Sequence, residues 1–170
     1  MLEGNVRIAA TIDDSIVDGV GLRFTIFTQG CRHHCKGCHN PKTWDFKGGY
    51  LVSVQDLYDE IMDNPLLDGV TFSGGDPFFQ PKPLALLAKA LHEAGKNVWA
   101  YTGFTLEKLQ EISLSDRNLK ELLDSVDVLV DGPFILEKRD ISLRFRGSSN
   151  QRVIDMIRTR EEGKPVLYLV

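Results

Sequence analysis

All three cysteines of this 170-residue chain lie within eight residues, in the stretch Gly30-Cys31-Arg32-His33-His34-Cys35-Lys36-Gly37-Cys38-His39. Cysteines that only fill a core are scattered among apolar neighbours, whereas this stretch is polar and basic. Basic neighbours favour the thiolate, which is the form that binds soft metals. An odd cysteine count also argues against a disulfide framework. Residues 30–39, which we call the cysteine loop, therefore predict a metal or redox centre around which the chain folds.

Three thiolates leave one position of a metal centre open, and the spacing allows more than one centre. In a zinc protein His33, His34 or His39 could fill that position, or water could, which would make the site catalytic. In a 4Fe-4S cluster the cysteines would hold three irons, and the fourth iron could bind a small molecule. Structural zinc usually draws its ligands as two separated pairs, and this chain has no second pair. The spacing favours a cluster and leaves zinc open.

The length and charge of the chain restrict the number of domains and the kinds of partner that we expect. The 170 residues fit one domain, so we expect a single domain over residues 1–170. Lys and Arg number 20 against 24 Asp and Glu, a net charge of -4, which disfavours nucleic acid as a partner. No leader sequence and no apolar run long enough for a membrane span is visible, so we expect a cytoplasmic protein without a membrane partner.

Strand and helix patterns alternate along the chain. Strands are expected at residues 5–12, 22–28, 69–72, 97–101, 126–130 and 166–170. Helices are expected from a cap at Ser53 onward, from Pro81 or Pro83 to Gly95, and at 105–112, 116–124 and 152–159, with 40–50 as a connecting loop. This alternation implies right-handed crossovers and a parallel sheet. At about 30 residues per strand-helix-strand unit, the chain predicts an α/β fold: an open, partial TIM-like barrel of five or six mainly parallel strands.

Polar loops follow three of the expected inner strands, and such loops form the site in α/β proteins. They are the cysteine loop, Ser73-Gly74-Gly75-Asp76-Pro77 and Thr102-Gly103. The paired glycines would let backbone groups approach a ligand, and Asp76 would supply an anionic acceptor. Asp131 also follows a strand, where it could contact a cofactor or simply form a turn. These loops predict a ligand site at one rim of the barrel.

The C-x3-C-x2-C spacing of Cys31, Cys35 and Cys38 resembles the signature of the radical S-adenosylmethionine enzymes. Residues 18–27 look like the lead-in of glycyl radical enzyme activases. The blocks 73–77, 101–103, 128–132 and 146–151 together look most like the activating protein of anaerobic ribonucleoside-triphosphate reductase. Two positions depart from the wider superfamily, because Asp76 stands where many members carry Glu and Gly37 where many carry an aromatic residue.

The resemblance implies a specific chemistry and a specific set of residues. The three cysteines would hold the cluster, and S-adenosylmethionine would chelate its fourth iron. Reductive cleavage would yield a 5′-deoxyadenosyl radical that takes a hydrogen atom from a glycine of the large reductase subunit, with a small electron donor such as flavodoxin. The positions implied to contact the cofactor are Gly37, Cys38, His39, Ser73, Gly74, Gly75, Asp76, Thr102 and Asp131.

Several alternatives stay open at this point. The chain could activate another glycyl radical enzyme such as pyruvate formate-lyase, or it could be a zinc-binding module without catalysis. The three histidines of the cysteine loop are expected to be exposed or to lie beside the ligands. Arg144, Arg146 and Arg152 are expected to face solvent or, with a slight preference, to dock the partner.

Overall fold

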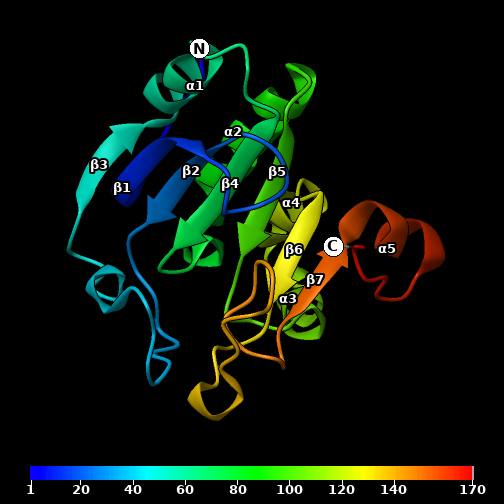
Figure 1. Ribbon diagram of the computed structural model, residues 1–170. Helices are drawn as coiled ribbons and strands as arrows, with labels where there is room; N and C mark the ends of the chain where they lie inside the picture. Colours follow the sequence, from blue (N-terminus) through cyan, green and yellow to red (C-terminus); the bar gives the residue numbers. More distant parts are fainter. Residues whose placement is uncertain (170) are drawn as a thin grey trace.

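The chain folds around one seven-stranded sheet with the strand order β3-β1-β2-β4-β5-β6-β7, seen in the computed structural model, which describes residues 1–169 (Figure 1). The strands are β1 (Asn5–Ser15), β2 (Arg23–Thr28), β3 (Tyr50–Ser53), β4 (Gly69–Gly74), β5 (Asn97–Tyr101), β6 (Val128–Asp131) and β7 (Arg152–Asp155). The helices are α1 (Val54–Met62), α2 (Pro81–Glu93), α3 (Leu106–Ser113), α4 (Arg117–Asp124) and α5 (Met156–Glu162). Three short 3-10 helices are η1 (Pro41–Thr43), η2 (Pro77–Phe79) and η3 (Leu136–Lys138).

The centre of the sheet is parallel and its margins are antiparallel. β2, β4, β5 and β6 pair in parallel, whereas β1, β3 and β7 each run antiparallel to a neighbour. β3 and β7 lie at opposite ends of the strand order, so the sheet is open. The predicted α/β class with an open sheet is confirmed. The sheet has seven strands, more than the five or six expected.

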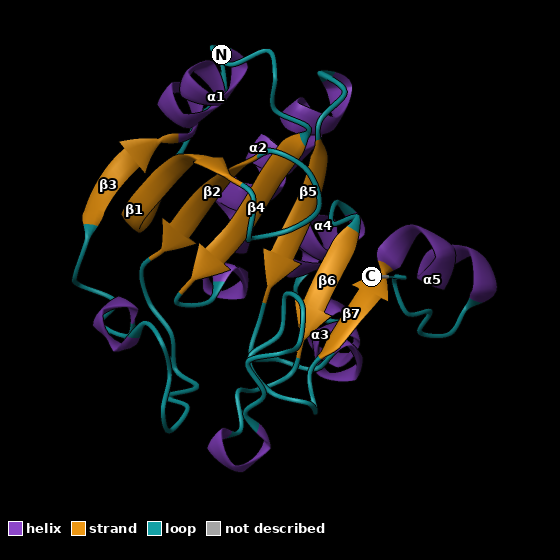
Figure 2. Cartoon of the chain, in the orientation of Figure 1, coloured by secondary structure: helices purple, strands orange, loops and turns teal. Residues whose placement is uncertain are grey.

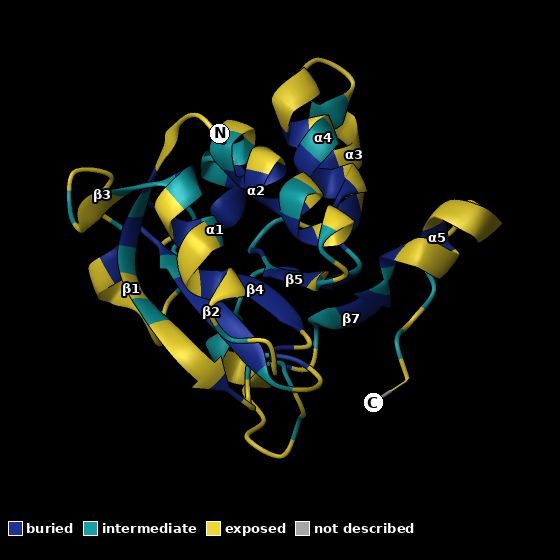
Figure 3. Cartoon of the chain, turned by 90° about the horizontal axis from the view of Figure 1, so that it is seen from above, coloured by how far each residue is buried: buried dark blue, intermediate teal, exposed yellow. Residues whose placement is uncertain are grey.

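Helices α1 to α4 cover one face of the sheet (Figure 2). The main core lies between these helices and the sheet, as the buried interior in Figure 3 shows. It contains fully buried side chains such as Phe72, Leu87 and Leu91. Ser53 begins α1 by accepting a hydrogen bond from the Asp56 N–H at 3.0 Å. This apolar layer fixes the positions of the strand ends that carry the polar loops.

The opposite face of the sheet is crossed by the segment from 16 to 22 that joins β1 to β2, visible in blue in Figure 1. The Asp18 carbonyl accepts a hydrogen bond from Thr71 Oγ1 at 2.9 Å. Beneath the segment lies Arg23, which is fully buried and donates to Thr71 Oγ1 at 2.7 Å and to the Val20 carbonyl at 2.9 Å. This face is therefore covered by the segment and its polar contacts, together with a small apolar cluster that includes Trp99, Val128 and Val130, rather than by a helix layer.

The loop expected at 40–50 is present up to Gly49 and contains η1, but the strand β3 that follows it and pairs with β1 was not expected. Two other expectations for the elements were wrong. The helix expected at 152–159 begins only at Met156, because Val153 and Ile154 pair with β6 as strand β7. The strand expected at 166–170 is reduced to one isolated bridge between Ile154 and Leu167, and its last residue lies outside the described residues.

The outer part of β1 is irregular. β3 pairs only with residues 5–8 of β1, and the pairing of β1 with β2 shifts register between Ile8 and Ala10 and again between Ile12 and Ser15. β1 therefore forms part of the margin of the sheet beyond the end of β3. Among residues 1–169, none of the helices combines the length and the apolar character that crossing a membrane requires.

Candidate active site

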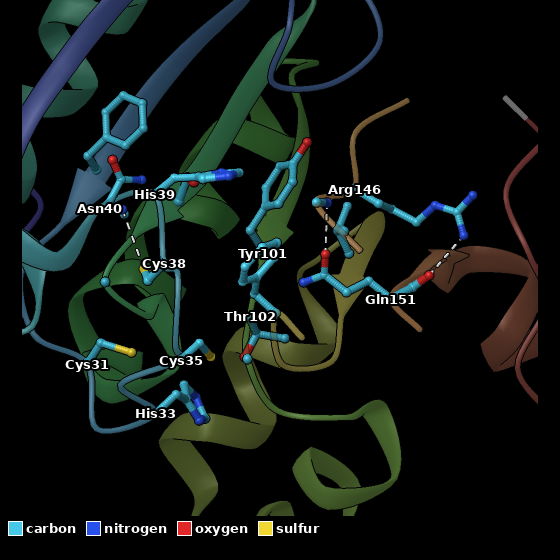
Figure 4. A pocket seen from close by; sticks show the side chains of 18 of the residues that line it. Cys31, His33, Cys35, Cys38, His39, Asn40, Tyr101, Thr102, Arg146 and Gln151 are labelled. Carbon is cyan, nitrogen blue, oxygen red and sulfur yellow. Dashed lines mark hydrogen bonds between the residues drawn. The ribbon is translucent and has the colours of Figure 1, made fainter. Parts of the chain in front are cut away.

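A cavity of about 370 Å³ opens at the carboxyl ends of the central strands. This volume falls in the range of roughly 300–1,000 Å³ that is typical of small-molecule sites. Its walls come from the cysteine loop after β2, the end of β4, the residues after β5 and β6, and the segment 145–151. Figure 4 shows the three cysteines on one side and Arg146 and Gln151 on the other, with Tyr101 between them. The polar loops predicted to share one rim do share it.

Cys31, Cys35 and Cys38 all line this cavity as free thiols. The Cys31 N–H donates to the Trp44 carbonyl at 3.1 Å and holds the start of the loop, and the Cys38 N–H donates to the Cys35 carbonyl at 3.0 Å, which closes a turn within it. Within residues 1–169 no three side chains of His, Cys, Asp or Glu converge as ligands of a single ion. A 4Fe-4S cluster uses each thiolate on a different iron. Three separate thiols facing one cavity fit that group.

Burial raises the pKa of the Cys31 thiol to about 11. The nearby backbone N–H groups of His33 and His34 oppose this rise in pKa only in part. The expectation that basic neighbours favour the thiolate is therefore wrong for Cys31, because desolvation outweighs them. Metal binding rather than solvent must stabilise this thiolate.

Gly74 and Gly75 line the cavity, and close backbone packing inside the protein also requires glycine at both positions. A Cβ at Gly74, whose φ is +96°, would overlap the Thr28 backbone, and a Cβ at Gly75 would overlap the Gly30 carbonyl. The Gly75 N–H donates to the Thr28 carbonyl at 2.8 Å. The two glycines thus let the end of β4 pack directly against the end of β2 and the start of the cysteine loop.

Asp76 lies beneath the cavity, fully buried, and not on its wall. Its Oδ2 accepts from His33 Nε2 at 2.7 Å, Thr102 Oγ1 at 2.8 Å and the Gly103 N–H at 3.0 Å. Its Oδ1 accepts from the Phe78 N–H at 3.0 Å. The structure therefore differs from the expectation that this side chain faces a cofactor, because protein donors already surround it.

Asp131 is also directed away from the cavity. It is buried and accepts from Arg152 Nε at 3.0 Å and from the Leu106 N–H at 2.8 Å, while its neighbours Val130 and Gly132 line the cavity. Arg152 also pairs with Glu107 at 2.6 Å, and these carboxylates raise its pKa. The guanidinium group of Arg152 thus binds two carboxylates of the same chain. These contacts do not support the expectation that Arg152 docks a partner.

The remaining predicted positions divide between the cavity wall and its margin. Ser73, Thr102 and His39 line the cavity, and the His39 ring lies 5.3 Å from the ring of Phe134. Gly37 is in the left-handed region at φ +77°, where a Cβ would crowd Leu136. Its turn brings Cys38 back toward the cavity, which a larger residue would hinder.

Tyr101, Arg146 and Gln151 line the cavity and were not predicted as site residues. Gln151 receives hydrogen bonds on its side chain from the Gly147 and Ser148 N–H groups, and Arg146 Nη1 donates to the Gln151 carbonyl at 3.0 Å. These bonds close the segment on itself, and Gln151 Nε2 donates to the Gly132 carbonyl at 2.9 Å, which holds the segment against the end of β6. The family-like blocks at 101–103 and 146–151 were the sequence signals that could have identified them.

Comparison with known proteins gives one consistent result. Residues 17–154 match the family described as a 4Fe-4S single cluster domain. The anaerobic ribonucleoside-triphosphate reductase-activating protein of Haemophilus influenzae is 38% identical over 144 residues, which cover 80% of this chain and 89% of that protein. The protein of the same name from Escherichia coli K12 is 36% identical, covering 81% of this chain and 91% of its own length.

More distant similarities are also present. The anaerobic ribonucleoside-triphosphate reductase-activating protein of bacteriophage T4 is 31% identical, covering 81% of this chain and 86% of its own. The crystal structure of QueE from Escherichia coli aligns with a TM-score of 0.48 and 19% identity, over 59% of this chain and 53% of that one. The long, high-coverage matches confirm the resemblance drawn from the cysteine loop and the later blocks. The chain belongs to the family of anaerobic ribonucleoside-triphosphate reductase-activating proteins, radical S-adenosylmethionine proteins with a single 4Fe-4S cluster domain.

Proposed function

We propose that this protein activates an anaerobic ribonucleoside-triphosphate reductase by installing a glycyl radical on its large subunit. The observation that carries the proposal is the shared cavity, into which three free thiols of one loop and the ends of β4 and β5 open together. Membership of the activase family supports the choice of partner.

In this proposal Cys31, Cys35 and Cys38 hold a 4Fe-4S cluster as thiolates. When bound, the cluster and S-adenosylmethionine supply a one-electron cleavage that yields a 5′-deoxyadenosyl radical able to take a hydrogen atom from a glycine. The protein itself must orient the cofactor and exclude water from the cavity.

The cavity wall offers groups for that orientation. Backbone groups of Ser73, Gly74 and Gly75 are proposed to receive the methionine amino group, with Thr102 beside them. Backbone around Cys38 and His39 is proposed to contact the adenine. Asp76 supports Thr102 from below through the 2.8 Å hydrogen bond and is not itself exposed to the cavity.

The apolar side chains of the cavity wall help to exclude water from the cavity. Tyr101, Phe134 and Phe145 line the cavity, and the buried residues of β5 and β6 lie behind them. A radical formed there is shielded from solvent on the sheet side, and the glycine loop of the partner must enter from the open side.

A small electron donor such as flavodoxin is proposed to reduce the cluster. A cytoplasmic location is also proposed, and it agrees with three cysteines that remain free thiols. Residues 1–170 are proposed to form one radical S-adenosylmethionine domain, since one sheet carries every element of the site.

The test is anaerobic reconstitution with iron and sulfide, reduction in the presence of S-adenosylmethionine, and a chromatographic assay for 5′-deoxyadenosine. The expected result is a cluster on the wild type, 5′-deoxyadenosine on reduction, and a glycyl radical signal by electron paramagnetic resonance when the reductase is added. Cys35→Ala should lose the cluster. Zinc in place of iron, or a reducible cluster that never yields 5′-deoxyadenosine even with the reductase, would overturn the proposal. A radical formed only on pyruvate formate-lyase would reassign the partner.

A further inference from the structure

His33 stands between the cysteine loop and the interior of the protein. It lies two residues after Cys31 and two before Cys35, and its side chain is only 17% exposed, unlike that of its exposed neighbour His34. The ring packs edge-on against Phe104 with centroids 4.5 Å apart, and lies 5.6 Å from Phe79. Its position is therefore defined by packing as well as by polar contacts.

The polar contact of His33 is with the most deeply buried carboxylate at the site. Its Nε2 lies 2.7 Å from Oδ2 of Asp76, whose side chain is 0% exposed. Because an ionised carboxylate only accepts hydrogen bonds, Nε2 carries the hydrogen. The same oxygen accepts from Thr102 Oγ1 and the Gly103 N–H, so the carboxylate is held by β5 independently of the cysteine loop.

The backbone of His33 belongs to the cysteine loop, between Cys31 and Cys35. Its ring reaches out of that loop to the Asp76 carboxylate. One residue thus joins the segment that carries two of the cysteines to a fixed carboxylate beneath the cavity.

We infer that His33 is a positioning residue, which fixes the cysteine loop for cluster binding by tethering it to Asp76. The inference deepens the proposed function and rests on it for the role of the cluster, but the tether itself belongs to the metal-free protein. It also gives Asp76 a role other than contact with the cofactor: Asp76 anchors the loop that carries the ligands.

Amide hydrogen exchange of the metal-free protein tests the tether directly. His33→Leu keeps a side chain that can pack against Phe104 but removes the donor. Loss of a hydrogen bond to a charged group predicts an acceleration of about tenfold to a hundredfold for the hydrogen-bonded loop amides of Cys31 and Cys38. His33→Gln restores an N–H donor at the end of a side chain of similar reach and should return exchange to within about threefold of wild type. Amides of β5 and α2 should exchange at the wild-type rate in every variant.

Two further variants keep the inference falsifiable. His34→Asn changes the neighbouring histidine, which stacks on Trp44 at 4.5 Å and sits at φ +47°, a conformation that Asn tolerates, so exchange should stay at the wild-type rate. Gly103→Ala should mimic His33→Leu, because its Cβ would lie 2.5 Å from Cδ2 of His33 and displace the ring. Equal exchange in His33→Leu and wild type, or His33→Gln as fast as His33→Leu, would overturn the inference.

The reconstituted protein supplies a second measurement. The electron paramagnetic resonance spectrum of the reduced cluster should be altered in His33→Leu and restored in His33→Gln. If the wild type binds no cluster at all, the proposed function fails while hydrogen exchange still decides the role of His33. If the wild type binds the cluster normally but His33→Leu changes neither the hydrogen exchange nor the spectrum, the tether is refuted and the proposed function stands.

Discussion

Arg23 places a guanidinium group inside the molecule on the face of the sheet that lacks helices. It is fully buried and donates to Thr71 Oγ1 at 2.7 Å and to the Val70 carbonyl at 2.8 Å. Burial lowers its pKa to about 10, so the group remains charged at neutral pH. Its Cζ also lies 5.5 Å from the ring centroid of Trp99. This single residue joins β2, β4, β5 and the segment above them.

Replacing Arg23 with Met should lower the free energy of unfolding by about 3 kcal/mol, because several buried acceptors lose their charged donor at once. Urea unfolding followed by circular dichroism measures the change. Thr71→Val removes one of these partners and should cost about 1 kcal/mol. If Arg23→Met costs no more than Thr71→Val, the guanidinium does not join the strands as its hydrogen bonds indicate.

At the scale of elements, short helices depend on their caps. α4 has eight residues, a length at which an isolated helix is marginal in water, and packs by Leu119, Leu122 and Leu123. Its N-cap is Asp116, whose Oδ1 accepts from the Leu119 N–H at 3.1 Å. Capping and packing together therefore maintain this helix.

Asp116→Ala should lower the free energy of unfolding by about 1 kcal/mol, because the first-turn N–H loses its acceptor. Asp116→Asn keeps an acceptor at the same place and should change it by only a few tenths of a kcal/mol. Chemical denaturation of both variants beside the wild type is the measurement. Equal losses in the two variants would assign the effect to charge rather than to capping.

Local patterns were sufficient for the elements whose own residues determine them. The inner strands were identified by apolar runs, and the cap at Ser53 by residue type, as its 3.0 Å hydrogen bond confirms. β3 and β7 could not be identified in this way, because each is only four residues long and forms by pairing with β1 or β6.

The site follows the same division. Strand order brought the polar loops to one rim as predicted, because parallel strands end on the same side. The orientation of Asp76 was not predictable, since it depends on His33, 43 residues away, and on Thr102, 26 residues away. Asp131 likewise turns inward because Arg152 and the start of α3 approach it from outside its own strand.

At the scale of the whole molecule, stability and the site occupy different regions. The main core lies between the sheet and α1 to α4, and it includes no residue of the cysteine loop. Besides the pair of Arg152 with Glu107, a second ion pair connects the helix layer to the sheet: His92 of α2 lies 2.7 Å from Asp127, whose carboxylate also accepts from the Val98 N–H at 2.7 Å. The hydrogen bond to Asp127 raises the pKa of His92.

Because the folded pKa of His92 lies above its unfolded value of about 6.5, this pair adds stability that is fully present below about pH 6.5 and is lost as the pH rises through the folded pKa. His92→Gln should therefore reduce the melting temperature most at pH 6, with a smaller difference from wild type at pH 9. Thermal melts of both proteins across this range measure it. A difference that grows with pH would contradict the assignment.

The irregular margin of β1 has a consequence for association between molecules. Beyond residue 8 its outer edge is not covered by β3, and an unpaired edge invites another strand to add to the sheet. The two register shifts interrupt the regular spacing of its hydrogen-bonding groups, and the exposed Asp13 and Asp14 place negative charge beside it. Both features oppose strand addition, so this edge protects the molecule against aggregation while its cavity side remains open to a partner.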